Sequence, residues 1–254
     1  MVLIDFREWS FGNLGYLPNA QKELLQREFN ALTKTATFKV VNLGGVQPFS
    51  LSSLFFENVE TIAVSPLKNI SQFYECIDIV LAAKNKEVID YTEAAEEEVY
   101  FYGQNSLVSH LASEIALCGI NELTDESLFE EYCEDFEFTP FSFELSNELL
   151  TSDVALFVED TLLICLEFIR DKKTKKDLFS LLKSNQIKVI TVTKDQVEKG
   201  VLNIKFVEKV LLMSKQTNGL LTTDQKEQLT NFKTEIVELP FLDKAGVKLR
   251  DIIA

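Results

Sequence analysis

The chain has 254 residues, of which 46% are hydrophobic, and can therefore bury a sizeable core; we expect a single domain over residues 1–254. Its net charge of −15 disfavours nucleic acids and anionic membrane surfaces as partners. Residues 1–6 lack the basic start and apolar run of an export signal, and no apolar run approaches the roughly 20 residues that span a membrane, so we expect a cytoplasmic protein.

Hydrophobic periodicity predicts alternating strands and helices along the first half of the chain. Strands are expected at residues 1–6, 38–42, 51–56, 61–65, 88–91 and 99–102, and helices at 19–33 and 69–83. A hairpin of 106–110 with 114–117 follows. A helix then opens at Thr124, with Asp125 and Glu126 in its first turn, where they suit the helix dipole, and ends near Glu134.

The second half continues the same rhythm. We expect a strand at 136–145, a hairpin of 154–158 with 162–168, helices at 171–184 and 221–232, and strands at 188–193, 209–213 and 234–239. Thr222 or Thr223 is expected to cap the last helix. The order strand, strand, helix, strand recurs in modules too small to bury themselves, which predicts radial or stacked packing around a shared core. A doubly wound sheet competes with this architecture, but its glycine-rich start is missing.

No cofactor or metal motif is present, and none of these groups is expected. The only histidine, His110, falls in a hairpin turn, where we expect it to face solvent. The cysteines form no C-x-x-C pair and are expected to be free, buried thiols: Cys76, Cys118, Cys133 and Cys165. From Glu87 to Glu167 the chain has many acids and no Lys or Arg, which indicates either differently solvated surfaces or an acidic pocket for a cationic ligand.

Five stretches carry short motifs in a fixed order. Residues 51–58 read L-S-S-L-F-F-E-N, residues 88–107 end in F-Y-G-Q-N-S-L, residues 115–143 place a helix before a strand containing T-P-F-S-F, residues 151–167 begin T-S-D-V, and residues 189–254 end in A-G-V-K-L-R-D-I-I-A. In this order and spacing they resemble motifs of the amidinotransferase/arginine deiminase superfamily, the pentein fold. They are most similar to those of bacterial citrulline- and arginine-handling hydrolases, in which the last four read L-E-G-T-G-S, Y-x-P-x-x-F, H-T-N-V and G-G-G-S-A-R-C-M-I-A.

The resemblance implies an α/β propeller of five β-β-α-β modules around a central channel, in agreement with the rhythm of strands and helices. It also implies an ancestral reaction, in which a thiolate attacks a guanidinium or ureido carbon and a histidine protonates the leaving nitrogen. Carboxylates in the pocket hold the cationic substrate.

The residues that this chemistry needs are not at the matching positions. Asp251 falls where the resemblance places the nucleophilic cysteine, Thr151 where it places the catalytic histidine, and Tyr102 where it places a substrate-binding glutamate. A carboxylate is a poor nucleophile toward a guanidinium carbon, although it could pair with a cationic ligand. The motif positions give these candidates for ligand binding: Asp251, Tyr102, Glu57, Asn58 and Asp153.

We therefore expect a catalytically inactive homologue, a pseudoenzyme, that binds a small cationic guanidino or amino ligand or a protein partner. The alternative is an active hydrolase or amidinotransferase-like enzyme on an arginine- or citrulline-type substrate, with Asp251 as a general base assisted by Tyr102 or His110. Asp251 could equally be a plain surface residue, or one in a salt bridge with Arg250 or Lys248. The oligomeric state stays open.

Overall fold

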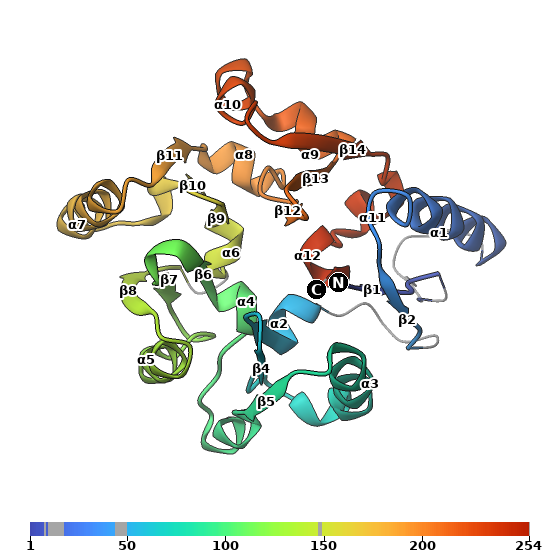
Figure 1. Cartoon of the computed structure of the whole chain (residues 1–254), viewed down its shortest axis with the longest axis horizontal. Helices are drawn as coiled ribbons and strands as arrows, with labels where there is room; N and C mark the ends of the chain where they lie inside the picture. Colours follow the sequence, from blue (N-terminus) through green and yellow to red (C-terminus); the bar gives the residue numbers. More distant parts are fainter. Residues whose placement is uncertain (8, 10–17, 44–49, 147–148, 254) are drawn as a thin grey trace. The chain divides into compact units, whose positions relative to one another are not determined.

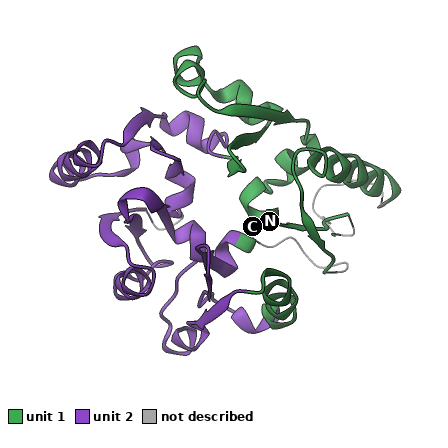
Figure 2. Cartoon of the chain, in the orientation of Figure 1, with its two compact units in different colours: residues 1–51, 73–85, 203–254 green, residues 52–72, 86–202 purple. Residues whose placement is uncertain are grey.

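The computed structural model describes residues 1–7, 9, 18–43, 50–146 and 149–253. The chain divides into two compact units (Figure 2). Unit 1 consists of residues 1–51, 73–85 and 203–254, and unit 2 of residues 52–72 and 86–202. The single domain expected over residues 1–254 stays a prediction. Each unit is described by itself below, with the elements as labelled in Figure 1.

The described part of unit 2 contains three sheets with the same internal order. Their strands are β3 (Phe55–Glu57), β4 (Thr61–Val64) and β5 (Glu87–Asp90); β6 (Leu107–His110), β7 (Ile115–Ile120) and β8 (Thr139–Glu144); and β9 (Ala155–Val158), β10 (Thr161–Ile164) and β11 (Lys188–Thr191). In each sheet the first two strands form an antiparallel hairpin, and the third pairs parallel to the second. The predicted order of strands and the predicted hairpins are confirmed.

Helices supply the crossovers that parallel pairing requires. The longer helices in the described part of unit 2 are α5 (Glu126–Asp135), α7 (Lys172–Ser184) and α8 (Lys194–Glu198), and 3₁₀ turns occur at Thr92–Glu97, Leu111–Ser113 and Leu166–Phe168. Asp125 caps α5 and Asp171 caps α7, because each carboxylate accepts hydrogen bonds from amides of the first turn. These caps explain why the helices begin where they do.

A helix of one turn precedes each hairpin of unit 2. These short helices are α2 (Leu51–Leu54), α4 (Gly103–Ser106) and α6 (Thr151–Val154); α2 begins at the boundary between the units. Beside the sheets, apolar side chains form two buried clusters. In one of them Tyr132 is fully buried, stacks on Tyr91 at 4.3 Å, and shares a 2.9 Å hydrogen bond with the hydroxyl of Ser65.

Unit 1 holds the remaining sheets. One sheet consists of two parallel strands, β1 (Val2–Ile4) and β2 (Lys39–Val41), and helix α1 (Pro18–Leu32) lies between them in the chain. The other sheet has the same strand order as the sheets of unit 2 and consists of β12 (Ile204–Val207), β13 (Val210–Ser214) and β14 (Lys233–Val237). In its described part, the other helices are α3 (Tyr74–Lys84), α9 (Lys215–Leu220), α10 (Thr223–Gln228), α11 (Pro240–Ala245) and α12 (Leu249–Ile252).

The two ends of the chain lie side by side (Figure 1), and Ile253 forms an antiparallel bridge with Leu3 of β1. Ile253 follows the short helix α12, and β1 is in turn parallel to β2. The order of short helix, antiparallel pair and parallel third strand is therefore present here too. The helix and Ile253, which stands in place of the first strand of this module, come from the C-terminal end of the chain, and β1 and β2 come from the N-terminal end.

Several predicted elements are wrong in detail. Residues 51–54 are helical, so the strand expected at 51–56 is confined to β3. Residues 99–102 form a loop and not the predicted strand. The backbone N–H of Phe101 donates a hydrogen bond of 3.2 Å to the carbonyl of Pro66, and the Phe101 side chain is fully buried, which explains the apolar pattern of this segment. The strand β12 and the helices α8, α9, α11 and α12 were not predicted, and the helix expected at 221–232 is confined to α10, whose cap is Thr222.

Candidate functional site

The residues that the motifs single out lie on or next to the short helices. Tyr102 is the N-cap of α4, Thr151 opens α6 and Asp153 is its third residue, all in unit 2. Asp251 is the third residue of α12, in unit 1. Asp153 and Asp251 therefore occupy equivalent positions in two helices of one turn.

Asp251 holds the end of the chain in place through both carboxylate oxygens. Its Oδ2 accepts a hydrogen bond of 2.8 Å from the backbone N–H of Lys248, which forms a capping box at the start of α12. Its Oδ1 accepts one of 2.6 Å from the hydroxyl of Ser50. The half-buried carboxylate is thus bound at both of its oxygens, and its contact with Lys248 at Oδ2 is to the backbone amide.

Thr151 is fully buried, and its hydroxyl joins three elements. The hydroxyl donates a hydrogen bond to the carbonyl of Ser106 at the end of α4, and accepts one of 2.7 Å from the amide of Gly119 in β7. A threonine hydroxyl has one proton to donate, and here that proton forms the hydrogen bond to the Ser106 carbonyl. The side chain at the histidine-like position therefore connects pieces of the fold.

Tyr102 and Gly103 shape the turn that starts α4. The Tyr102 amide donates a 2.8 Å hydrogen bond to the hydroxyl of Ser106. Burial raises the pKa of the Tyr102 phenol, although a hydrogen bond with the Lys68 backbone opposes the shift, so the phenol is protonated at neutral pH. Gly103 has φ of +46°, and a Cβ there would lie 2.5 Å from the Phe55 carbonyl oxygen, so the position requires glycine.

A buried chain of polar side chains links the short helices of unit 2. The Asn105 Nδ2 donates to the hydroxyl of Ser53 at 2.8 Å, and the Asn105 Oδ1 accepts from the hydroxyl of Ser152 at 2.9 Å. Since these residues lie on α4, α2 and α6, one amide side chain connects three helices that are far apart in sequence. This role was not predicted from the sequence; a polar residue inside each of the three short helices is the signal that could have revealed it.

The other three candidates for ligand binding make local contacts. Glu57 forms an ion pair of 2.8 Å with Lys86. The Asn58 Oδ1 accepts from two backbone amides of the β3–β4 turn, at 2.9 and 2.8 Å. The Asp153 Oδ2 accepts from the amide of Leu150 at 3.0 Å, as Asp251 does from Lys248. Their role toward a ligand stays a prediction.

His110 is 4% exposed, so the expectation that it faces solvent is wrong. Its Nε2 lies 3.0 Å from an Asp160 carboxylate oxygen, its Nδ1 accepts from the Ser113 amide at 3.2 Å, and the ring of Phe157 packs against it at 5.3 Å between centroids. Because Nδ1 is an acceptor here, Nε2 carries the proton and donates it to Asp160.

The predicted free, buried state of the four cysteines is confirmed. Burial raises the pKa of each thiol, to about 12 for Cys133 and well above the usual value for Cys118. These thiols therefore lack the thiolate character of a nucleophile. Within the described ranges, no group of three or more His, Cys, Asp or Glu residues is arranged to hold a metal ion. Nor does any described helix have the length and apolar character needed to cross a membrane.

Comparison with solved structures shows the fold. The N-terminal domain of ArgZ, a cyanobacterial arginine dihydrolase, as a cysteine-to-serine mutant with bound substrate, matches with a TM-score of 0.76 and 12% identity over 99% of this chain and 95% of that one. A dimethylarginine hydrolase (DDAH) from Pseudomonas aeruginosa in complex with citrulline matches with a TM-score of 0.66 and 11% identity, over 99% of this chain and 96% of that one. The predicted pentein-type α/β fold is confirmed.

The apo structure of ArgZ matches with a TM-score of 0.76 and 11% identity over 99% of this chain, which spans only 39% of that one. No curated protein sequence matches the chain. The family model described as N,N dimethylarginine dimethylhydrolase, eukaryotic, matches residues 67–244, more than half of the chain. The chain therefore belongs to this family, within the amidinotransferase/arginine deiminase superfamily.

Proposed function

We propose that the chain is a catalytically inactive member of this family, a pseudoenzyme with a binding role. The observation that carries the proposal is the state of Asp251. It stands where the resemblance places the nucleophilic cysteine, and its two oxygens accept hydrogen bonds from Ser50 and from the Lys248 amide. A carboxylate is a far weaker nucleophile than a thiolate toward a guanidinium carbon.

Thr151 supports the same proposal. It stands where the resemblance places the proton-donating histidine, and a hydroxyl does not exchange protons near neutral pH as an imidazole does. Its proton is bound to the Ser106 carbonyl in the interior of unit 2. Tyr102 stands where the resemblance places the substrate-binding glutamate. Because burial raises the pKa of its phenol, the phenol stays protonated at neutral pH and cannot act as a base.

We propose a small cationic guanidino or amino ligand as what the protein binds. The Pseudomonas aeruginosa relative was solved in complex with citrulline. The segment from Glu87 to Glu167, with many acids and no Lys or Arg, would attract a cation. A protein partner is the second candidate for the binding role. We also propose a cytoplasmic location, which suits four cysteines that remain free thiols.

The first test is for turnover. The purified chain is incubated with arginine, citrulline, agmatine and dimethylarginine, and ammonia, ornithine, urea and citrulline are measured. We expect none to form. Turnover that disappears in Asp251→Asn but persists in Asp224→Asn would overturn the proposal. Asp224 is an exposed residue of α10, so Asp224→Asn removes the same charge as Asp251→Asn and serves as the control.

The second test is for binding without chemistry. The same compounds are titrated against the chain by calorimetry, with thermal unfolding as a parallel readout. Saturable binding of a guanidino compound without turnover supports the cationic ligand, because a ligand that binds only the folded state stabilises it by mass action. If no compound binds, the ligand proposal fails, and a pull-down then tests for the protein partner.

A further inference from the structure

Unit 1 contains a polar pocket of about 300 Å³, lined by Asp5, Arg7, Lys22, Gln26 and Asn42. Asp5 directly follows β1 and Asn42 directly follows β2. Because the two strands are parallel, their carboxyl ends lie at the same edge, where ligands of α/β proteins commonly bind. Lys22 and Gln26 are four residues apart on α1, which places both on the face that borders the pocket.

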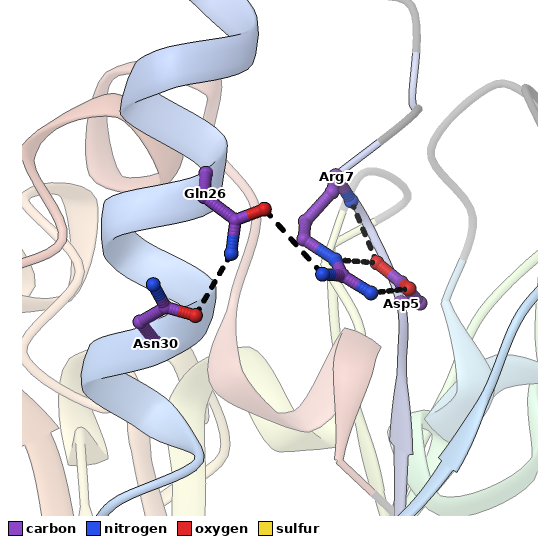
Figure 3. A network of polar contacts seen from close by, with 4 residues as sticks. All are labelled: Asp5, Arg7, Gln26 and Asn30. Atoms are coloured by element: carbon purple, nitrogen blue, oxygen red, sulfur yellow. Dashed lines mark hydrogen bonds and ion pairs between the residues drawn. The ribbon is translucent and has the colours of Figure 1, made fainter.

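The guanidinium of Arg7 is held in one orientation (Figure 3). Its Nε donates to Asp5 Oδ1 at 2.7 Å and its Nη2 donates to Asp5 Oδ2, while its Nη1 lies 3.4 Å from Gln26 Oε1. Gln26 is fixed in turn by a 2.8 Å hydrogen bond from its Nε2 to Asn30. The ring of Phe29 lies 4.4 Å from the guanidinium carbon. This arrangement orders the arginine before any ligand arrives.

The charge of the pocket is positive. Asp5 is 3% exposed, and burial raises the pKa of its carboxyl, but the hydrogen bonds and the positive charge of Arg7 outweigh burial and lower the pKa. Asp5 is therefore ionised at neutral pH and cancels the charge of Arg7. Lys22 adds a further positive charge, and no carboxylate of the described chain pairs with it. The pocket is thus locally cationic on a chain of net charge −15.

We propose that this pocket binds the oxyanion group, carboxylate or phosphate, of a small metabolite. Arg7, whose side chain is 37% exposed, offers the planar donor geometry that oxyanions prefer, and Lys22 offers a point charge. The volume lies at the lower end of the range for small-molecule sites. For a cationic ligand the described lining offers one carboxylate, Asp5, which is buried and already paired with Arg7. The proposal is independent of whether the protein catalyses a reaction.

Calorimetric titration of the whole chain with inorganic phosphate and, separately, with succinate at constant ionic strength tests this site. We expect saturable binding of at least one anion; the tighter of the two shows whether the site favours a tetrahedral or a planar group. Lys22→Gln, which removes a positive charge, and Arg7→Lys, which keeps the charge but loses the planar set of donors, should each weaken binding about tenfold. Lys34→Gln, which removes the same charge from unit 1 outside the pocket, should leave it unchanged.

Two results would overturn the site. One is the absence of saturable binding of either anion at millimolar concentration. The other is an equal effect of Lys22→Gln and Lys34→Gln, which would mean that overall charge alone attracts the anion. Lys22 is exposed, so Lys22→Gln decides the outcome even if Arg7→Lys fails to fold.

Discussion

The hydroxyl of Ser50 donates a 2.6 Å hydrogen bond to Oδ1 of Asp251, although 201 positions separate the two residues. The other oxygen of the same carboxylate caps the helix α12 through the Lys248 amide. One side chain therefore fixes the last turn of helix and ties it to the residue before α2. The position where the resemblance places the nucleophile has a structural use in this chain.

Asp251→Ala should lower the free energy of unfolding by about 2 kcal/mol, because it removes a helix cap and a side-chain hydrogen bond. Urea denaturation measures the change. Ser50→Ala keeps the helix cap, removes the second of these two contacts, and should cost about 1 kcal/mol. In a double-mutant cycle the two substitutions should be coupled; strictly additive effects would show that the Ser50–Asp251 contact contributes nothing.

Thr151→Val should destabilise unit 2 by about 2 to 3 kcal/mol, because valine has the same shape but leaves the buried Gly119 amide and Ser106 carbonyl without the hydroxyl. Thr151→Ser keeps both hydrogen bonds and loses one methyl group, at a cost of about 1 kcal/mol. Chemical denaturation compares them. A valine variant as stable as the serine variant would contradict the bridging role of the hydroxyl.

Asn105→Ala should cost about 2 to 3 kcal/mol, since the buried amide contacts Ser53 on α2 and Ser152 on α6. Ser53→Ala, which breaks only one of these two contacts, is the matched comparison and should cost about 1 kcal/mol. Hydrogen exchange of the amides in β6 and β9, which follow these helices, reports the same loss locally. Equal stabilities of the two variants would show that Asn105 does not link the helices.

The elements that were predictable from the sequence depend on neighbours along the chain. Short apolar runs marked the strands β10 and β11, and a Thr three residues before Gln marked the start of α10. The strand β12 is identified by its antiparallel pairing with β13. Its place could therefore not be found from its own residues.

The motif positions led to the correct short helices but not to the contacts within them. Asp251 and Thr151 could be placed by resemblance, whereas Ser50 and Ser106, their partners, lie 201 and 45 positions away. His110 was expected in solvent because polar residues are common in turns, and it is buried because Phe157 and Asp160 of another hairpin cover it. Contacts of this kind follow from tertiary packing, which local patterns do not specify.

Glu28 should make the stability of unit 1 depend on pH. It is 3% exposed, and its carboxylate accepts from the amides of Phe241 and Leu242 at the start of α11, at 2.6 and 3.1 Å. Burial raises the pKa of Glu28 above its usual 4.5; the two hydrogen bonds oppose the shift, and the charge of Asp243 adds to it. The folded state therefore holds the proton more tightly than the unfolded state does. The tighter proton binding at Glu28 stabilises the folded state fully below pH 4.5, and this stabilisation is lost as the pH rises through the raised pKa.

Glu28→Gln removes this titration while keeping one acceptor for the amides of α11. The free energies of unfolding of the two proteins are compared from about pH 8 to about pH 5, above the isoelectric point of 4.6, where solubility is lowest. The stability of the wild type relative to Glu28→Gln should increase as the pH falls. The comparison uses the difference in stability between the two proteins because burial also raises the pKa of Asp243. Asp243 is present in both proteins, so its contribution cancels in the difference. Glu23→Gln, an exposed change on the same helix, should show no such trend, and a flat difference for Glu28→Gln would mean that the Glu28 carboxyl has the same pKa in both states.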